Sequence, residues 1–131
     1  MAYIEWDSSL ELGVHTIDNQ HKELIKLINE FHEGISKKEP KETMQKLLKG
    51  LQTYTVYHFS FEENLLKRHD KQALFIHKME HTNFINKVQD YAERVNSGKM
   101  LLSVEVTGFL KEWLRNHIKV TDKSHTRFFK A

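Results

Sequence analysis

Residues 77–95, HKMEHTNFINKVQDYAERV, carry a histidine or an apolar side chain at steps of four and three residues. The positions in this series are His77, His81, Phe84, Val88, Tyr91 and Val95. Such steps follow the 3.6-residue period of an α-helix, so these side chains share one face. The stretch therefore predicts an amphipathic helix whose buried face includes two histidines one turn apart.

Three other segments show the same stepping and predict three more helices. The first helix begins near Thr16 or Asp18, either of which can cap its free amide groups, and ends within 36–40. The second ends at a break over 68–71, and the third ends at 96–98, Asn-Ser-Gly. The expected inward positions of these helices are Ile17, Leu24, Ile25, Ile28, Phe31 and Ile35; Leu47, Leu51, Tyr54, His58, Phe61 and Leu65; and Val106, Leu110, Trp113 and His117. Short links between amphipathic helices predict an all-α, up-down-up-down antiparallel four-helix bundle.

The composition fits one domain and excludes several classes of function. We expect an irregular N-terminal arm over 1–16 and the bundle over 17–131. The 20 basic and 18 acidic residues are mixed along the chain, which argues against binding to nucleic acid or to a membrane surface. The absence of cysteine excludes disulfides and thiolate metal sites. No apolar run reaches membrane-spanning length and no signal-peptide core is present, so we expect a cytoplasmic protein.

The nine histidines are the unusual part of the composition, and four of them fall on inward helix faces. A single buried imidazole is most often a core residue with a hydrogen-bond partner, but His58, His77, His81 and His117 together indicate a metal site. His77 and His81 are four residues apart, within reach of one metal ion. Glu62 has the same spacing from His58. Alone it would be a partly solvated residue at the stripe's edge, but beside these histidines it is a candidate ligand.

Two further candidates are less well supported by spacing. His117 and Asp122 are five residues apart, which places them about 140° apart on a regular helix. They can converge only if the helix bends, bulges or ends between them, and three β-branched residues in this interval disfavour a regular helix. A surface cap explains Asp122 equally well. His21 lies just inside the first helix, where histidines are often exposed.

The segments IDNQHKEL, HFSFEENL, HKMEH and WLRNHIKVTD, in this order and at these separations, resemble the hemerythrin family in its bacterial single-domain branch. The similarity covers essentially the whole chain, including WDSSLELGV before the first helix. It implies a non-haem centre of two iron ions held by five histidines and two bridging carboxylates. By this resemblance one iron is bound by His77, His81 and His117, the other by His21 and His58, and the bridges are Glu62 and Asp122.

The number of ligands has a functional consequence. Two octahedral irons offer about twelve positions, and these residues with one oxo or hydroxo bridge fill all but one. The open position falls on the iron of His21 and His58, and an open position indicates that a small ligand binds. The resemblance implies reversible binding of molecular oxygen for storage, transport or delivery. Trp113 and Leu114, about one turn before His117, are expected to line the ligand pocket.

Two other functions were weighed. The first is a sensor of oxygen, nitric oxide or redox state that acts with a signalling partner; a carrier would instead supply an oxygen-consuming enzyme. The second is a di-iron oxidase, which is less favoured because the Glu-x-x-His motif of ferritin-like enzymes is absent. We therefore do not expect an enzyme. Of the other histidines, His15, His32, His69 and His125 are expected at the surface, and family members often carry a tyrosine at position 125.

Overall fold

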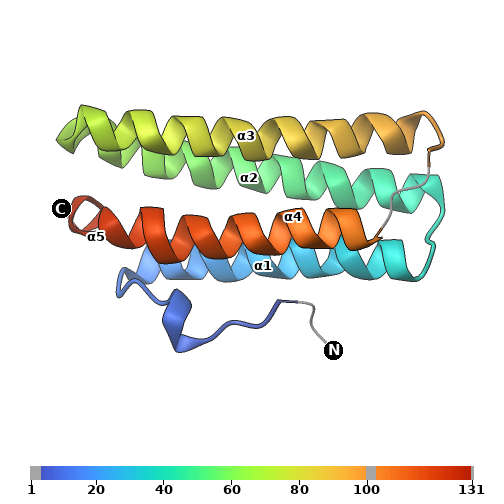
Figure 1. Cartoon of the computed structure of the whole chain (residues 1–131), viewed down its shortest axis with the longest axis horizontal. Helices are drawn as coiled ribbons and strands as arrows, with labels where there is room; N and C mark the ends of the chain where they lie inside the picture. Colours follow the sequence, from blue (N-terminus) through green and yellow to red (C-terminus); the bar gives the residue numbers. More distant parts are fainter. Residues whose placement is uncertain (1–3, 100–102, 131) are drawn as a thin grey trace.

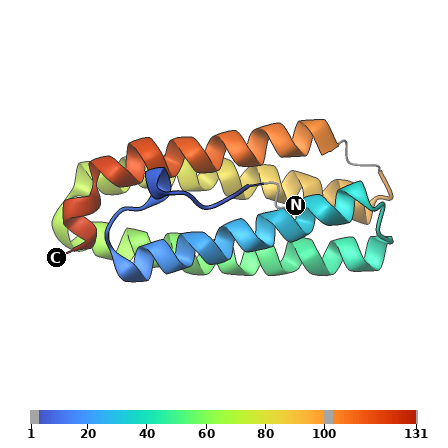
Figure 2. The same cartoon turned by 90° about the horizontal axis from the view of Figure 1, so that it is seen from below.

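Four long antiparallel helices form a bundle in the computed structural model (Figure 1). They are α1 (His15–Ser36), α2 (Lys41–His69), α3 (Lys71–Asn96) and α4 (Ser103–Asn116). In both views α1 lies beside α2 and α2 beside α3, and α4 packs back against α1 (Figures 1 and 2). The predicted all-α four-helix bundle is confirmed. The structure describes residues 4–99 and 103–130, so positions 1–3 of the predicted arm and 100–102 and 131 of the predicted bundle lie outside the described residues.

Three short elements lie at the end of the bundle where α1 begins and α4 ends. They are the 3-10 helix η1 (Ser8–Leu10), the π-helix η2 (His117–Asp122), which continues α4, and α5 (Thr126–Phe129). The arm that contains η1 runs along α1, where the Asn29 side chain accepts from the backbone N–H of Ile4 at 2.7 Å and donates to its carbonyl at 2.9 Å. None of the helices in the described part of the chain is long and apolar enough to cross a membrane.

The start of α1 differs from the prediction. The helix begins at His15, and neither of the two expected capping residues occupies its N-cap, which is Val14. Asp18 instead accepts hydrogen bonds from the backbone N–H groups of Leu12, at 2.9 Å, and Gly13, at 3.1 Å. The carboxylate therefore ties the arm to the first helical turn, because it reaches backwards to the loop rather than forwards along the helix.

The buried face of α3 matches the prediction at every position, but that of α2 does not. Four residues expected to face inward on α2 are only half-buried: Leu47, Tyr54, Phe61 and Leu65. The buried series is Met44, Leu48, Leu51, Thr55, His58, Phe59, Glu62 and Leu66. The predicted register was wrong by one residue over much of the helix, and Glu62 lies at the centre of the buried face rather than at its edge.

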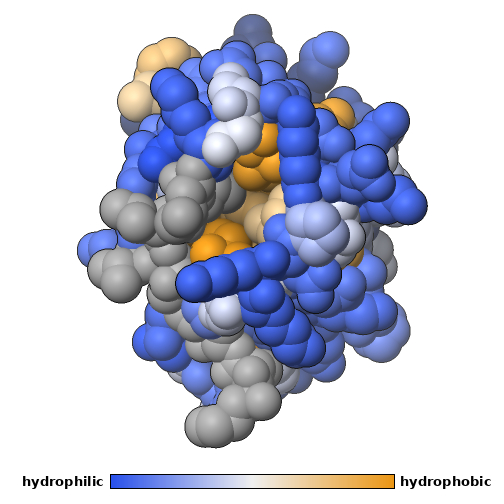
Figure 3. Space-filling view, turned by 90° about the vertical axis from the view of Figure 1, so that its right-hand side faces the viewer, coloured by the Kyte–Doolittle hydropathy of each residue, from blue (hydrophilic) through white to orange (hydrophobic). Residues whose placement is uncertain are grey.

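The two ends of the bundle differ in character. At the end that carries the link between α1 and α2, apolar atoms lie in a hollow ringed by hydrophilic residues (Figure 3). At the opposite end lie the loop before α1, η2 and α5 (Figures 1 and 2). The predicted ligands lie toward this end, because they occupy the start of α1 and α3, the second half of α2, and η2.

A single residue joins α2 to α3, as the predicted break over 68–71 required. The backbone N–H of Asp70 donates to the carbonyl of Leu66 at 2.8 Å, and its side chain accepts from the N–H of Ala73 at 2.9 Å. Asp70 therefore ends one helix and caps the next.

We expect Asp70→Ala to lower the free energy of unfolding by about 1 kcal/mol, because the first turn of α3 loses its cap. Urea denaturation followed by circular dichroism measures this change. Asp70→Asn keeps the acceptor oxygen and should retain most of the stability. An equal loss in both variants would contradict the capping role.

Candidate metal centre

Seven side chains predicted as ligands come together in the core, from four elements of the bundle. None is more than 2% exposed. The group consists of His21 from α1, His58 and Glu62 from α2, His77 and His81 from α3, and His117 and Asp122 from η2. Five imidazoles and two carboxylates thus meet away from solvent.

The π-helix brings the last two ligand candidates together. In η2 the hydrogen bonds run from residue i to i+5, so residues five apart lie near one another. His117 Nε2 is 3.2 Å from Asp122 Oδ1. The predicted irregularity between these residues is confirmed, and the surface-cap reading of Asp122 is wrong because the side chain is fully buried.

Three histidines lie around one oxygen of Glu62, and two of them also approach one oxygen of Asp122. Oε1 of Glu62 lies 3.2 Å from His81 Nε2, 3.6 Å from His117 Nε2 and 4.0 Å from His77 Nδ1. Oδ1 of Asp122 lies 3.2 Å from His117 Nε2 and 3.6 Å from His77 Nδ1. These nitrogens and oxygens therefore surround one point between α2, α3 and η2.

The other two histidines face the second oxygen of Glu62, and one of them also approaches the second oxygen of Asp122. Oε2 of Glu62 lies 3.6 Å from His21 Nε2 and 3.5 Å from His58 Nε2. Oδ2 of Asp122 lies 3.1 Å from His21 Nε2. Glu62 and Asp122 thus stand between two groups of histidines and present one oxygen to each group.

Most of the buried nitrogen and oxygen atoms of these seven side chains make no hydrogen bond with any described residue. They are both nitrogens of His21, Nε2 of His58, Nδ1 of His77 and all four carboxylate oxygens of Glu62 and Asp122. Buried polar atoms are rarely left without partners, because their desolvation then goes uncompensated. Cations between the carboxylates would satisfy these atoms, and imidazole and carboxylate suit iron. The donor set therefore fits the di-iron centre that the sequence resemblance implies.

Three of the histidines are oriented by partners on their outer nitrogen, Nδ1. The bonds join His58 to Gln20 at 2.7 Å, His81 to Glu63 at 2.8 Å and His117 to Glu80 at 2.6 Å. Because these partners accept through oxygen, Nδ1 carries a proton and Nε2 is the nitrogen that faces the centre.

Sequence reasoning missed these partners, although each is adjacent in sequence to a predicted ligand. Gln20 precedes His21, Glu63 follows Glu62, and Glu80 precedes His81. The next residue on a helix is rotated by about 100°, so its side chain points across to a neighbouring helix. A polar residue beside a ligand is the signal that could have identified them.

His125 corrects the expectation of a surface residue. It is half-buried, and its Nδ1 lies 3.0 Å from His77 Nε2. The chain after η2 turns back over the start of α3, and Phe129 packs edge-on against the His77 ring at 5.9 Å. Of the others, His15 and His69 are exposed as predicted, whereas His32 is half-buried.

Aromatic rings cover the three-histidine side of the centre. Phe59 stacks on His81 with 3.8 Å between ring centroids, and Trp113 stacks on His117 at 4.5 Å. Leu114, the residue after Trp113 on α4, is also buried. Phe59 was not predicted, although an aromatic residue directly after His58 was a usable signal. These rings fix the planes of two imidazoles.

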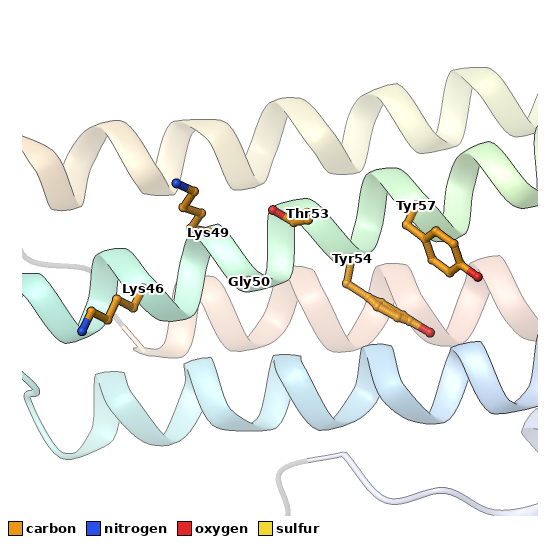
Figure 4. A pocket seen from close by; sticks show the side chains of 6 residues that line it. All are labelled: Lys46, Lys49, Gly50, Thr53, Tyr54 and Tyr57. Carbon is orange, nitrogen blue, oxygen red and sulfur yellow. The ribbon is translucent and has the colours of Figure 1, made fainter.

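A separate hollow lies on the surface of α2, lined by Lys46, Lys49, Gly50, Thr53, Tyr54 and Tyr57 (Figure 4). These side chains include neither a histidine nor a carboxylate. The hollow therefore has no part in the chemistry of the buried cluster, which is the candidate centre.

Residues 12–124 match the family model described as the hemerythrin HHE cation binding domain. The chain belongs to the hemerythrin family. It is 35% identical over 125 residues to bacteriohemerythrin of Pseudomonas aeruginosa PAO1, which covers 95% of this chain and 80% of the relative. It is 32% identical over 118 residues to myohemerythrin of Theromyzon tessulatum, and the match covers 90% of this chain and 87% of the relative. A crystal structure of wild-type hemerythrin matches with a TM-score of 0.87 at 26% identity, over 98% of both chains.

Charge within the hemerythrin centre is balanced by two histidines. Burial opposes a charge on His21, but contacts with Asp122 and Glu62 outweigh burial and raise its pKa to about 9. The same carboxylates, with Glu80, raise the pKa of His117 well above its usual value despite burial. Burial acts to raise the pKa of Glu62 and of Asp122, but the neighbouring histidines outweigh it and lower both. The two anions therefore attract positive charge to the centre.

His58 and His77 are neutral at pH 7. Burial is the main cause, and it lowers the pKa of each to about 4. A neutral imidazole keeps a lone pair for a metal ion, whereas protonated His21 and His117 must first lose a proton.

Binding of ferrous ions at pH 7 is expected to release about two protons per chain from His21 and His117, besides any proton that solvent loses in forming the bridge. Because these protons compete with the metal, the apparent affinity should rise with pH between about 6 and 9. An indicator dye in weak anaerobic buffer measures the release. Metal binding without proton release would contradict the charge assignment.

Proposed function

We propose that this chain binds molecular oxygen reversibly at a centre of two non-haem iron ions, and that it serves oxygen storage, transport or delivery. The observation that carries the proposal is the division of the carboxylate oxygens of Glu62 and Asp122 between two groups of histidines. Two anions shared in this way suit two adjacent cations better than one. Membership of the hemerythrin family supports iron as the metal.

The proposed ligands follow the two groups. His77, His81 and His117 hold one iron, His21 and His58 hold the other, and Glu62 and Asp122 bridge the pair. An oxo or hydroxo group from solvent would complete the bridge. The side with two histidines has one ligand fewer, so oxygen is assigned to that side. When bound, the ferrous ions supply the electrons that oxygen takes up and gives back.

The protein must admit oxygen while it keeps water and stray protons from the centre. Phe59 and Trp113 cover imidazole rings, and Leu114 and Ile118 are buried around the same part of the bundle. Trp113 and Leu114 stay our candidates for the lining of the oxygen pocket on the strength of the sequence, although Trp113 stacks on His117 of the three-histidine side. An apolar lining lets a neutral diatomic molecule pass and disfavours ions.

The same surroundings favour a carrier over an oxidase. Among the described residues, the acids and bases outside the ligand set that contact the ligand histidines are Glu63, Glu80 and His125, and all three lie against histidines of the three-histidine group. An oxidase needs a group that delivers protons to reduced oxygen. With no such group bonded to His21 or His58 among the described interactions, bound oxygen is expected to leave unchanged.

Purified protein reduced without air and then exposed to oxygen should develop colour that fades again when oxygen is removed. Anaerobic absorption spectroscopy over several cycles measures this behaviour, with iron content determined on the same sample. Irreversible oxidation in the first cycle would favour an oxidase. A colourless protein that retains only zinc would contradict the proposal.

His77→Ala is expected to lose at least one of the two irons, because the three-histidine side loses a ligand and the contact to His125. Metal analysis after anaerobic loading gives the iron content per chain. His69→Ala is the matched control, since His69 is exposed near the end of α2 and should leave the iron content unchanged. Full retention of iron by His77→Ala would show that the ligand assignment is wrong.

A further inference from the structure

We infer that Glu80 is a positioning residue that holds both ends of the π-turn in η2, and so aims His117 and Asp122 at one centre. The inference rests on the proposed function, because it concerns how that iron site is shaped. It assigns to a residue outside the ligand set the task of keeping a locally unfavourable backbone in place.

The π-turn needs support from outside its own sequence. π-helical turns are rare, and a chain relaxed to a regular helix would rotate Asp122 away from His117. The turn contains the β-branched residues Ile118, Val120 and Thr121, which lose side-chain freedom in a helix. Ile118 packs in the core, but Val120 is 61% exposed and contributes little packing on the outer side. Contacts with a neighbouring helix must therefore stabilise the turn.

Glu80 makes two such contacts from α3. Its Oε1 accepts from His117 Nδ1 at 2.6 Å, and its Oε2 accepts from the Thr121 hydroxyl at 2.7 Å. His117 is the first residue of the π-turn, and Thr121 directly precedes Asp122, the last. One carboxylate thus spans the turn along the side that faces α3.

Asp122 depends on this arrangement because no residue outside the ligand set holds its carboxylate. Neither of its oxygens hydrogen-bonds to a described residue, so the backbone that carries the side chain must aim it at the histidines. The adjacent Thr121 is fixed by Glu80. Loss of the Thr121 hydroxyl would free that end of the turn while the bond between Glu80 and His117 remained.

Glu63 provides a matched comparison. It is also a carboxylate that accepts from the Nδ1 of a histidine, His81, at 2.8 Å, and it bonds to no residue of η2 among the described interactions. Removal of Glu63 therefore tests the general effect of an outer carboxylate, without any effect on the π-turn.

The test is hydrogen–deuterium exchange of the iron-loaded protein, read by mass spectrometry on peptides that cover 117–123. Exchange in this segment is expected to be about tenfold faster in Glu80→Ala and in Thr121→Val, because each removes a hydrogen bond that holds the turn closed. Thr121→Ser keeps the hydroxyl and should exchange like the wild type. Glu63→Ala should leave exchange of this segment unchanged.

The double variant Glu80→Ala/Thr121→Val should exchange no faster than Glu80→Ala alone, because both substitutions remove the same contact. Any of three results would overturn the inference. They are an exchange rate in Thr121→Val equal to that of the wild type, an increase in Glu63→Ala as large as that in Glu80→Ala, and an increase in the double variant equal to the product of the two single increases. Iron content is measured on the same samples. A wild type without iron would contradict the proposed function, whereas the exchange comparison would still decide the role of Glu80.

Discussion

The arrangement of the rest of this structure depends on two carboxylates that are buried without hydrogen bonds. Glu62 and Asp122 are fully buried, and their four oxygens face only histidine nitrogens. An unpaired buried anion is strongly destabilising, so the fold must bring positive charge to this point. Two protonated histidines, or the metal ions that replace their protons, satisfy that demand. The bundle therefore places imidazoles from α1, α2, α3 and η2 around the same pair of anions.

That demand explains why regular helices are not sufficient. Three helices present their ligands on ordinary faces, but the fourth must supply His117 and Asp122 from an interval of five residues. The π-turn of η2 provides the required rotation. Contacts with the surrounding residues offset the unfavourable free energy of a π-helical backbone. Local irregularity in an otherwise regular bundle thus coincides with the site, as strain at functional positions usually does.

The sequence predicted the fold well where spacing alone decides it. The face of α3 was correct at every position because its steps of four and three are unbroken. The face of α2 was off by one residue, since the long helix carries aromatic and apolar side chains on several sides. Glu62 was therefore misplaced at an edge. Contacts such as His77 with His125 could not be foreseen, because they depend on how the chain after η2 folds back toward α2 and α3.

The partners outside the ligand set make the centre asymmetric in a way that bears on function. On the three-histidine side, His81 and His117 each bond to a carboxylate. On the other side, His58 bonds to the neutral amide of Gln20, and the Nδ1 of His21 makes no bond to any described residue.

A carboxylate partner increases the basicity of a metal-binding imidazole and fixes its orientation. The iron of His77, His81 and His117 should therefore be the more firmly held, and that of His21 and His58 the more adaptable. Adaptability is of use only where a ligand must arrive and leave. The uneven support of the histidines thus favours the proposal that oxygen binds the iron of His21 and His58, which the count of open positions also indicates.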